Sequence, residues 1–184
     1  PLFCDLIQRG PRGSLNSGIP NVGFDQTNIN VATLDTSGVD FQLVYDLDLW
    51  DIGLDGLGSI RFDYASTYLD ELSLTPAQGV TPNECAGDHA GACRIPSPKY
   101  RHRLLNRWTT PWDINVDLTW RYFSSTANDI ITNVNPPVDR KIDTTQYLDL
   151  AVRYVATDAI TFRAGVNNVL GEQPPVVTAA GPPS

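Results

Sequence analysis

Apolar and polar residues alternate with a period of two along most of the chain, which is the pattern of β-strands whose two faces differ. The clearest run extends from Trp112 to Tyr122, where the even positions are apolar or aromatic and the odd positions are Asp, Asn, Asp, Thr and Arg. No segment shows the 3.6-residue period of a helix. The sequence therefore predicts an all-β protein.

The alternation predicts about six strands, within residues 29–49, 60–68, 100–108, 112–122, 147–154 and 160–167. The connections between them alternate in length. Residues 50–58, 110–111 and 156–159 form short turns, whereas residues 70–99 and 124–144 form long loops. Short turns at one end and long loops at the other are typical of an outer-membrane barrel. We expect an antiparallel up-and-down transmembrane β-barrel, here a partial barrel of about six strands.

Aromatic residues favour a membrane barrel over a soluble sheet, because they gather near both ends of the apolar face. Belts of Trp and Tyr at the two interfaces are typical of barrels in lipid. Trp112 and Trp120 are eight residues apart, or roughly 26 Å at ~3.3 Å per residue, and a tilt near 40° reduces this to a depth of ~20 Å. The predicted belts are Tyr68, Tyr100, Trp120 and Tyr122 beside the long loops, and Trp108, Trp112, Tyr154 and Phe162 beside the short turns.

Charged residues occupy the opposite face, which would line a wet interior. If Trp108 pairs with Trp112 across the turn at residues 110–111, Arg107 faces Asp113, and Arg103 likewise faces Asp117. Opposite charges facing each other across a ladder contribute about 0.2–1 kcal/mol each, so we predict this register; a shift by two residues keeps the faces but loses the charge match. The predicted interior charges are Arg101, Arg103, Arg107, Asp113, Asp117, Arg121, Asp149, Arg153 and Arg163.

The amino-acid composition limits the kinds of partner that the protein is expected to bind. The chain carries 13 Lys+Arg against 21 Asp+Glu, a formal net charge of −8, which argues against nucleic acid because phosphate binding needs a basic face. It contains no run of about 18 apolar residues that would predict a membrane-spanning helix. Closed barrels are the other structure that spans lipid, so we expect outer-membrane lipid as a partner.

The cysteines predict a disulfide rather than a metal site. Cys85 and Cys93 lie in a polar segment rich in Pro and Gly, and their spacing suits a loop disulfide in an oxidising compartment. Asp88 and His89 could complete a metal site with them, but seven residues between two cysteines is poor spacing for zinc. We expect no metal and no cofactor. Cys4 is either free or bonded to a cysteine outside this chain.

Four segments resemble TonB-dependent outer-membrane receptors. Residues 36–41 resemble the family's Gly-Val-Glu sequence at the start of a strand, and residues 98–108 resemble a late barrel strand. Residues 164–175 resemble the segment before the last strand, with Leu170-Gly171 where the family usually has Leu-Phe. Residues 3–9 resemble an external loop of some receptors. The resemblance extends over about residues 3–177.

This resemblance implies a barrel of about 22 strands around an N-terminal plug. Residues 1–184 would then be a C-terminal portion of the barrel, without the plug domain and the last strand. The family is known for TonB-dependent uptake of a scarce nutrient, such as a siderophore, a cobamide or an oligosaccharide, across the bacterial outer membrane. The implied partners are the small-molecule nutrient, the TonB complex through the missing N-terminal part, and the remainder of the barrel. Ligand contacts are expected from loops 70–99 and 124–144.

Two other classes of protein remain open. A soluble all-β binding or adhesive module also shows alternating strands, but it would dissolve without detergent. An outer-membrane barrel hydrolase uses a lipid-facing Ser–His pair, and Ser66 and His102 share the predicted apolar face. No Asn, Asp or Glu is obviously placed to orient the imidazole, so we do not expect an enzyme.

Overall fold

The computed structural model describes residues 4, 6–15, 22–24, 32–77, 79–89, 93, 95–127 and 141–175. The chain divides into two compact units, residues 1–32 and 33–184. In the first unit, β1 (Ile7–Gln8) pairs antiparallel with β2 (Gly23–Phe24). The thiol of Cys4 in this unit is exposed and free. The second unit contains all the longer strands.

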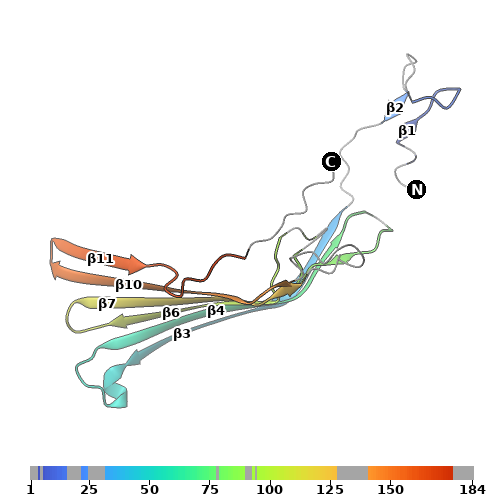
Figure 1. The fold of residues 1–184 in the computed structure, drawn as a ribbon. Helices are drawn as coiled ribbons and strands as arrows, with labels where there is room; N and C mark the ends of the chain where they lie inside the picture. Colours follow the sequence, from blue (N-terminus) through green and yellow to red (C-terminus); the bar gives the residue numbers. More distant parts are fainter. Residues whose placement is uncertain are drawn as a thin grey trace. The chain divides into compact units, whose positions relative to one another are not determined.

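Six long strands of the second unit form one antiparallel sheet (Figure 1). Their spatial order is β11-β10-β7-β6-β4-β3, so each long strand pairs with the next one along the chain. This confirms the predicted all-β up-and-down arrangement, and the sheet stays open at β3 and β11. The bounds are β3 (Thr33–Asp48), β4 (Ser59–Thr75), β6 (Tyr100–Thr109), β7 (Ile114–Phe123), β10 (Thr145–Thr157) and β11 (Ile160–Val166).

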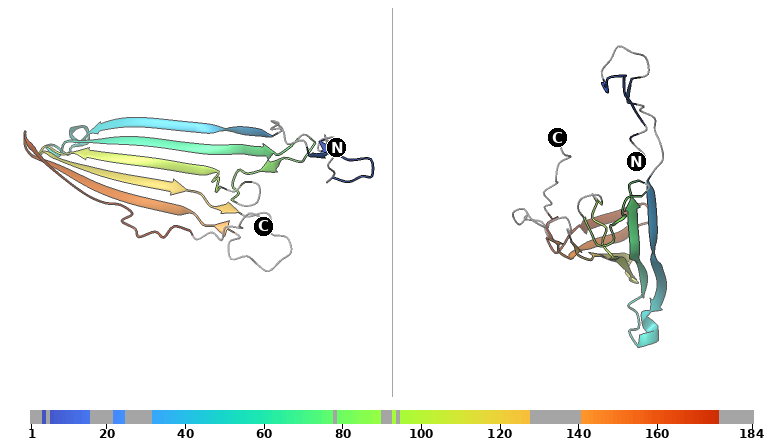
Figure 2. Two further views of the ribbon diagram at one scale, coloured as in Figure 1. Left: turned by 90° about the horizontal axis from the view of Figure 1, so that it is seen from above. Right: turned by 90° about the vertical axis from the view of Figure 1, so that its right-hand side faces the viewer.

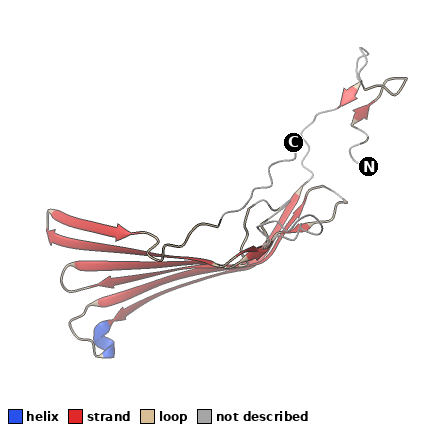
Figure 3. Ribbon diagram, viewed as in Figure 1, coloured by secondary structure: helices blue, strands red, loops and turns tan. Residues whose placement is uncertain are grey.

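The connections sort by length as predicted, with three short turns at one end of the sheet and two long connections at the other (Figure 3). The β3–β4 turn holds a 3₁₀ helix, η1 (Leu49–Ile52), in which the Asp48 carboxylate accepts a hydrogen bond from the Trp50 N–H. Within the described residues, no helix is long and apolar enough to cross a membrane. The long connections carry the two-residue strands β5 (Asn83–Glu84), β8 (Thr126–Ala127) and β9 (Lys141–Ile142).

The register between β6 and β7 differs from the predicted one. Trp108 pairs with Val116 and Arg107 pairs with Asp117, so the predicted pairing of Arg107 with Asp113 is wrong. The turn takes the four residues 110–113 instead of two. Trp112 and Asp113 consequently lie in this turn and not in strand β7. Opposite charges still meet across the ladder, but at a different pair of positions.

Thr110 and Pro111 account for the longer turn. The Thr110 N–H and hydroxyl both donate to the Ile114 carbonyl, at 2.9 and 2.8 Å, and the hydroxyl accepts from the Trp112 N–H at 3.3 Å. Pro111 has no N–H to offer a ladder and suits the second position of a turn. Asp113 closes the turn in the left-handed region, with φ 60°. A two-residue turn would lose these bonds.

The apolar face of the sheet has no second layer over it. Among the described residues, the only buried apolar side chains are Leu49, Ala77, Cys85 and Ala86, all in turns and loops. Phe162, on the apolar face, exposes 62% of its surface. A soluble sheet buries such side chains in a core. The apolar face therefore needs an apolar surrounding that this chain does not supply.

A β-bulge interrupts the β3–β4 hairpin near its long-loop end. Gly38 pairs with Leu69 but Ser37 pairs with Glu71, so Asp70 has no residue opposite it. Strand β4 continues through this bulge to Thr75, seven residues beyond the predicted end at residue 68. The long loop that was predicted at residues 70–99 therefore starts only after the strand ends.

The bulge depends on Gly38 and reverses the alternation of β4. A Cβ on Gly38 would lie 2.5 Å from the Tyr68 carbonyl oxygen, so only glycine admits this approach. Below the bulge, Tyr68 lies on the apolar face, where it pairs with Tyr100. Above it, Leu72 and Leu74 pair with even-numbered residues of β3, which lie on the polar side. The apolar outer face therefore ends at the bulge.

Candidate functional site

The predicted interior charges share one face of the sheet, with the exception of Asp113 in its turn. Residues directly opposite each other on neighbouring strands point to the same side, and the pairings connect these positions from β4 to β11. This side is called the polar face below. Its residues include Arg61, Arg101, Arg103, Arg107, Asp117, Arg121, Asp149, Arg153 and Arg163.

Ion pairs cross the polar face between neighbouring strands. The guanidinium of Arg107 donates two hydrogen bonds to the Asp117 carboxylate, at 2.7 and 3.2 Å. Arg121 reaches Asp149 at 2.8 Å. These pairs are partly exposed, and exposed pairs contribute only about 0–1 kcal/mol each. Their main effect is to place donors and acceptors at defined positions along this face.

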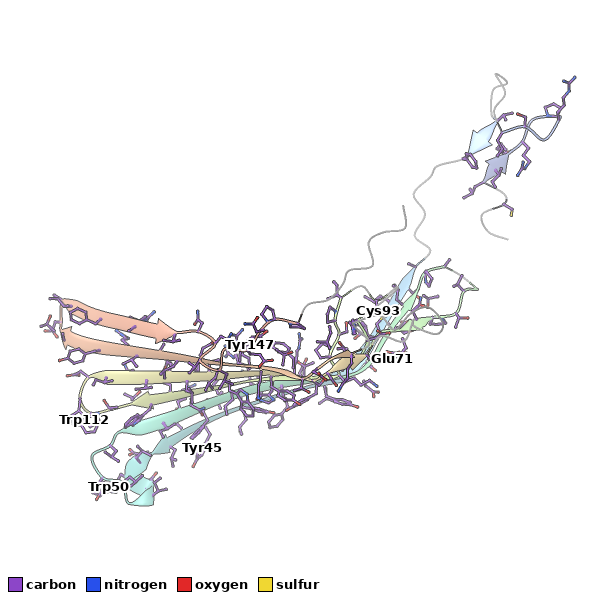
Figure 4. The ribbon with its side chains drawn as sticks, viewed as in Figure 1. Tyr45, Trp50, Glu71, Cys93, Trp112 and Tyr147 are labelled. Carbon is purple, nitrogen blue, oxygen red and sulfur yellow. A yellow bond between two sulfur atoms is a disulfide. The ribbon has the colours of Figure 1, made fainter. Side chains whose placement is uncertain are left out.

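Three hollows open on the polar side of the sheet. One of about 540 Å³ is lined by residues that include Asp40, Gln42, Arg101 and Arg121, and another of about 640 Å³ lies beside the long loops. The third lies towards the short turns and includes Arg163. Figure 2 shows the curl of the sheet, and the side chains Tyr45 and Tyr147 lie on opposite sides of it in Figure 4. The polar face is thus the hollowed one.

The two long connections contact each other above the polar face. The predicted disulfide between Cys85 and Cys93 is confirmed, so these cysteines do not offer thiolates to a metal. The His89 N–H donates to the Ala127 carbonyl at 3.1 Å, and the imidazole lies 3.0 Å from the Thr126 hydroxyl. His89 and Thr126 are both buried at this contact. Part of the predicted ligand loop 124–144 lies outside the described residues, which end at 127 and resume at 141.

Glu84 ties β5 to β4 at the base of the disulfide loop. Its carboxylate accepts hydrogen bonds from the Leu72 N–H at 3.0 Å and the Ala86 N–H at 2.9 Å. These two backbone donors stabilise the charged form and lower the pKa of Glu84 below its ordinary value of 4.5. The attachment of β5 therefore depends on an ionised carboxylate.

Acidification is expected to loosen this attachment. Because the folded-state pKa of Glu84 is lowered, its stabilisation is complete above pH 4.5 and is lost as the pH falls through the lowered pKa. In NMR spectra of the protein in micelles, the amide signals of Leu72 and Ala86 should shift together over this acidic range. Glu84→Gln should abolish the shift, and Glu71→Gln should preserve it. An unchanged titration in Glu84→Gln would contradict this assignment.

The structure places Ser66 and His102 side by side and packs the imidazole among aromatic rings. The two residues are directly opposite on β4 and β6. The imidazole stacks on Tyr122, with centroids 5.0 Å apart, and meets the edge of Trp120 at 4.7 Å. Within the described part of the chain, neither ring nitrogen has a hydrogen-bond partner. His102 thus packs as one of the aromatic rings of the apolar face.

The predicted aromatic residues fall near the two ends of the apolar face, except Trp112 in its turn. Near the long loops, Tyr68 pairs with Tyr100. Near the short turns, Tyr154 pairs with Phe162, and the indole N–H of Trp108 donates to a backbone carbonyl at 2.8 Å. Such amphipathic rings suit the boundary between water and an apolar medium.

The sequence reading missed two polar-face residues that the alternation already marked. Tyr147 occupies an odd position of β10, opposite Arg121, and the guanidinium carbon of Arg121 lies 5.2 Å from the centre of its ring. Phe123 lies on the same face, opposite Arg101. On this face they add apolar contact surface between the arginines.

Comparison with known proteins adds one match. Residues 5–169 match the family model described as TonB-dependent receptor-like, β-barrel. No curated protein and no solved structure matches the chain significantly.

Proposed function

Since the chain belongs to the TonB-dependent receptor family by its β-barrel region, we propose that it is the C-terminal portion of a receptor that imports a scarce nutrient across the bacterial outer membrane. The family consists of outer-membrane transport receptors and not of enzymes. This membership removes the soluble binding module as an alternative. The nutrient is expected to be a siderophore, a cobamide or an oligosaccharide.

The observation that carries the proposal is the difference between the two faces of the open sheet. In the part of the chain that the structure describes, the strand residues of the apolar face are half-buried or exposed, which suits hydrocarbon. The opposite face is hollowed and lined by charges, which suits a solvated interior through which a polar solute passes. The unpaired edges at β3 and β11 need further strands, which the remainder of the barrel would supply. Contact with TonB would come from the N-terminal part.

Nutrient uptake by cells tests this function. The full-length receptor would be produced in a strain that lacks its own outer-membrane uptake receptors, with iron, a cobamide or an oligosaccharide as the limiting nutrient in parallel cultures. We expect growth to be restored for one of these nutrients, and only when TonB is present, because the family couples uptake to this complex. The matched control is the same strain without TonB.

Two results would count against the proposal. One is growth that is restored equally with and without TonB, which would indicate a passive pore. The other is a receptor that is assembled in the outer membrane, as judged by its heat-modifiable migration in gels, but restores growth on no nutrient of the three classes.

A further inference from the structure

The described strands of the polar face carry a small excess of positive charge, in a chain whose net charge is −8. Its described strands place more arginines than aspartates on this face. The arginines are Arg61, Arg101, Arg103, Arg107, Arg121, Arg153 and Arg163, and the aspartates are Asp40, Asp46, Asp48, Asp63, Asp117 and Asp149. Most of the acidic residues therefore lie elsewhere in the chain.

Two of these arginines meet near the long-loop end. Arg103 lies directly opposite Arg121 on the neighbouring strand, an arrangement of like charges that destabilises a ladder by itself. Two aspartates compensate for it incompletely. Arg121 has a close partner in Asp149 at 2.8 Å, whereas Arg103 approaches Asp63 only to 3.8 Å.

Arg101 adds a third guanidinium beside this pair. It follows on the same face two residues away from Arg103, and it forms no ion pair with any described residue. The Nε donor of Arg121 is buried and has no hydrogen-bond partner among the described residues, while its guanidinium is held over the ring of Tyr147. Three adjacent arginines thus retain donors that the described protein groups do not use.

Two of the arginines border open space, although the Nε of Arg121 itself is buried. Arg101, Arg121 and Phe123 line both of the two larger hollows, of about 540 and 640 Å³. A solute in this space would meet guanidinium groups beside an aromatic ring, with Asp40 also lining one hollow and Asp143 the other. The planar fork of arginine matches the oxygen geometry of carboxylate and phosphate groups.

We propose that Arg101, Arg103 and Arg121 form an anion-binding site, which holds a carboxylate or phosphate group of the imported nutrient at the outer end of the barrel interior. This inference rests on the proposed function for its physiological ligand. The binding of the anion itself does not depend on transport, so the two can fail separately.

Calorimetric titration of the purified full-length receptor in detergent tests the site. The probes are citrate for the carboxylate class, inorganic pyrophosphate for the phosphate class, and glucose as an uncharged solute. We expect saturable binding of at least one anion and none of glucose. The double variant Arg101→Gln/Arg121→Gln should raise the Kd at least tenfold, and Arg101→Lys should retain part of the affinity.

Arg163→Gln is the matched control, because Arg163 lies on the same face near the short turns. It should leave the Kd unchanged, and heat-modifiable migration verifies that every variant is folded. The proposal is overturned if neither anion binds, as expected if acidic groups elsewhere in the full receptor already occupy the arginines. An equal loss in Arg163→Gln would also overturn it. TonB-dependent growth on an uncharged nutrient, together with absent anion binding, would leave the proposed function standing without this site.

Discussion

Replacement of Leu118 with arginine is expected to destabilise the membrane-inserted receptor by about 2–4 kcal/mol. Leu118 lies at the middle of β7 on the apolar face, and it pairs with Asn106 on one side and Leu150 on the other. At this depth a guanidinium has no water and no counterion within reach. The measurement is urea-induced unfolding of the full-length receptor in phospholipid vesicles.

Thr119→Arg is the matched control for this experiment. Thr119 is the next residue along the same strand, but it lies on the polar face and pairs with Asp149. Its replacement should change the free energy of unfolding by less than ~1 kcal/mol. Equal destabilisation by the two variants would contradict the assignment of the faces to lipid and interior.

Gly58→Ala should produce the second large loss, of about 2–4 kcal/mol, because it combines backbone strain with a steric clash. Gly58 has a φ of +85°, and a Cβ there would lie 2.0 Å from the Thr109 carbonyl oxygen. The Gly58 carbonyl also accepts the Leu49 N–H at 3.0 Å, which closes the β3–β4 turn. Any shift of this residue therefore disturbs three neighbouring strands.

Gly56→Ala separates the two causes of this loss. Gly56 also has a positive φ, of +72°, but a Cβ there would meet nothing within 4 Å. Its replacement should cost only the backbone penalty of about 1–2 kcal/mol. Unfolding in urea would measure both variants. Similar losses for the two would show that the close approach of β6 to Gly58 is unimportant.

The period-two pattern predicted the strands and their faces because the side on which a residue lies is set by its own strand. The register between strands was not readable in the same way. A turn of four residues at Thr110 leaves every residue of β6 and β7 on the same face as a turn of two, so the alternation does not distinguish them. The longer turn is favoured by hydrogen bonds of the Thr110 hydroxyl. The alternation of apolar and polar residues carries no information about these bonds.

The contacts within the candidate site also depend on the register between strands, which the sequence pattern does not reveal. The sequence identified Arg101, Arg103 and Arg121 as residues of one face, but which aspartate each arginine meets follows from the register. The opposition of Arg103 and Arg121 appears only once that register is known. The end of β4 was missed for a related reason, since the extra residue Asp70 breaks the alternation and hides the last part of the strand.

The single unpaired residue Asp70 has a consequence for the height of the receptor rim. Below the bulge, the outer side of the β3–β4 ribbon is apolar. Above the bulge, the outer side is polar and carries Ser37, Glu71 and Ser73. One inserted residue thus exchanges an apolar outer side of the ribbon for a polar one. Strands β3 and β4 can therefore be longer or shorter by two residues each above the bulge, without any change to the strands below it that face hydrocarbon.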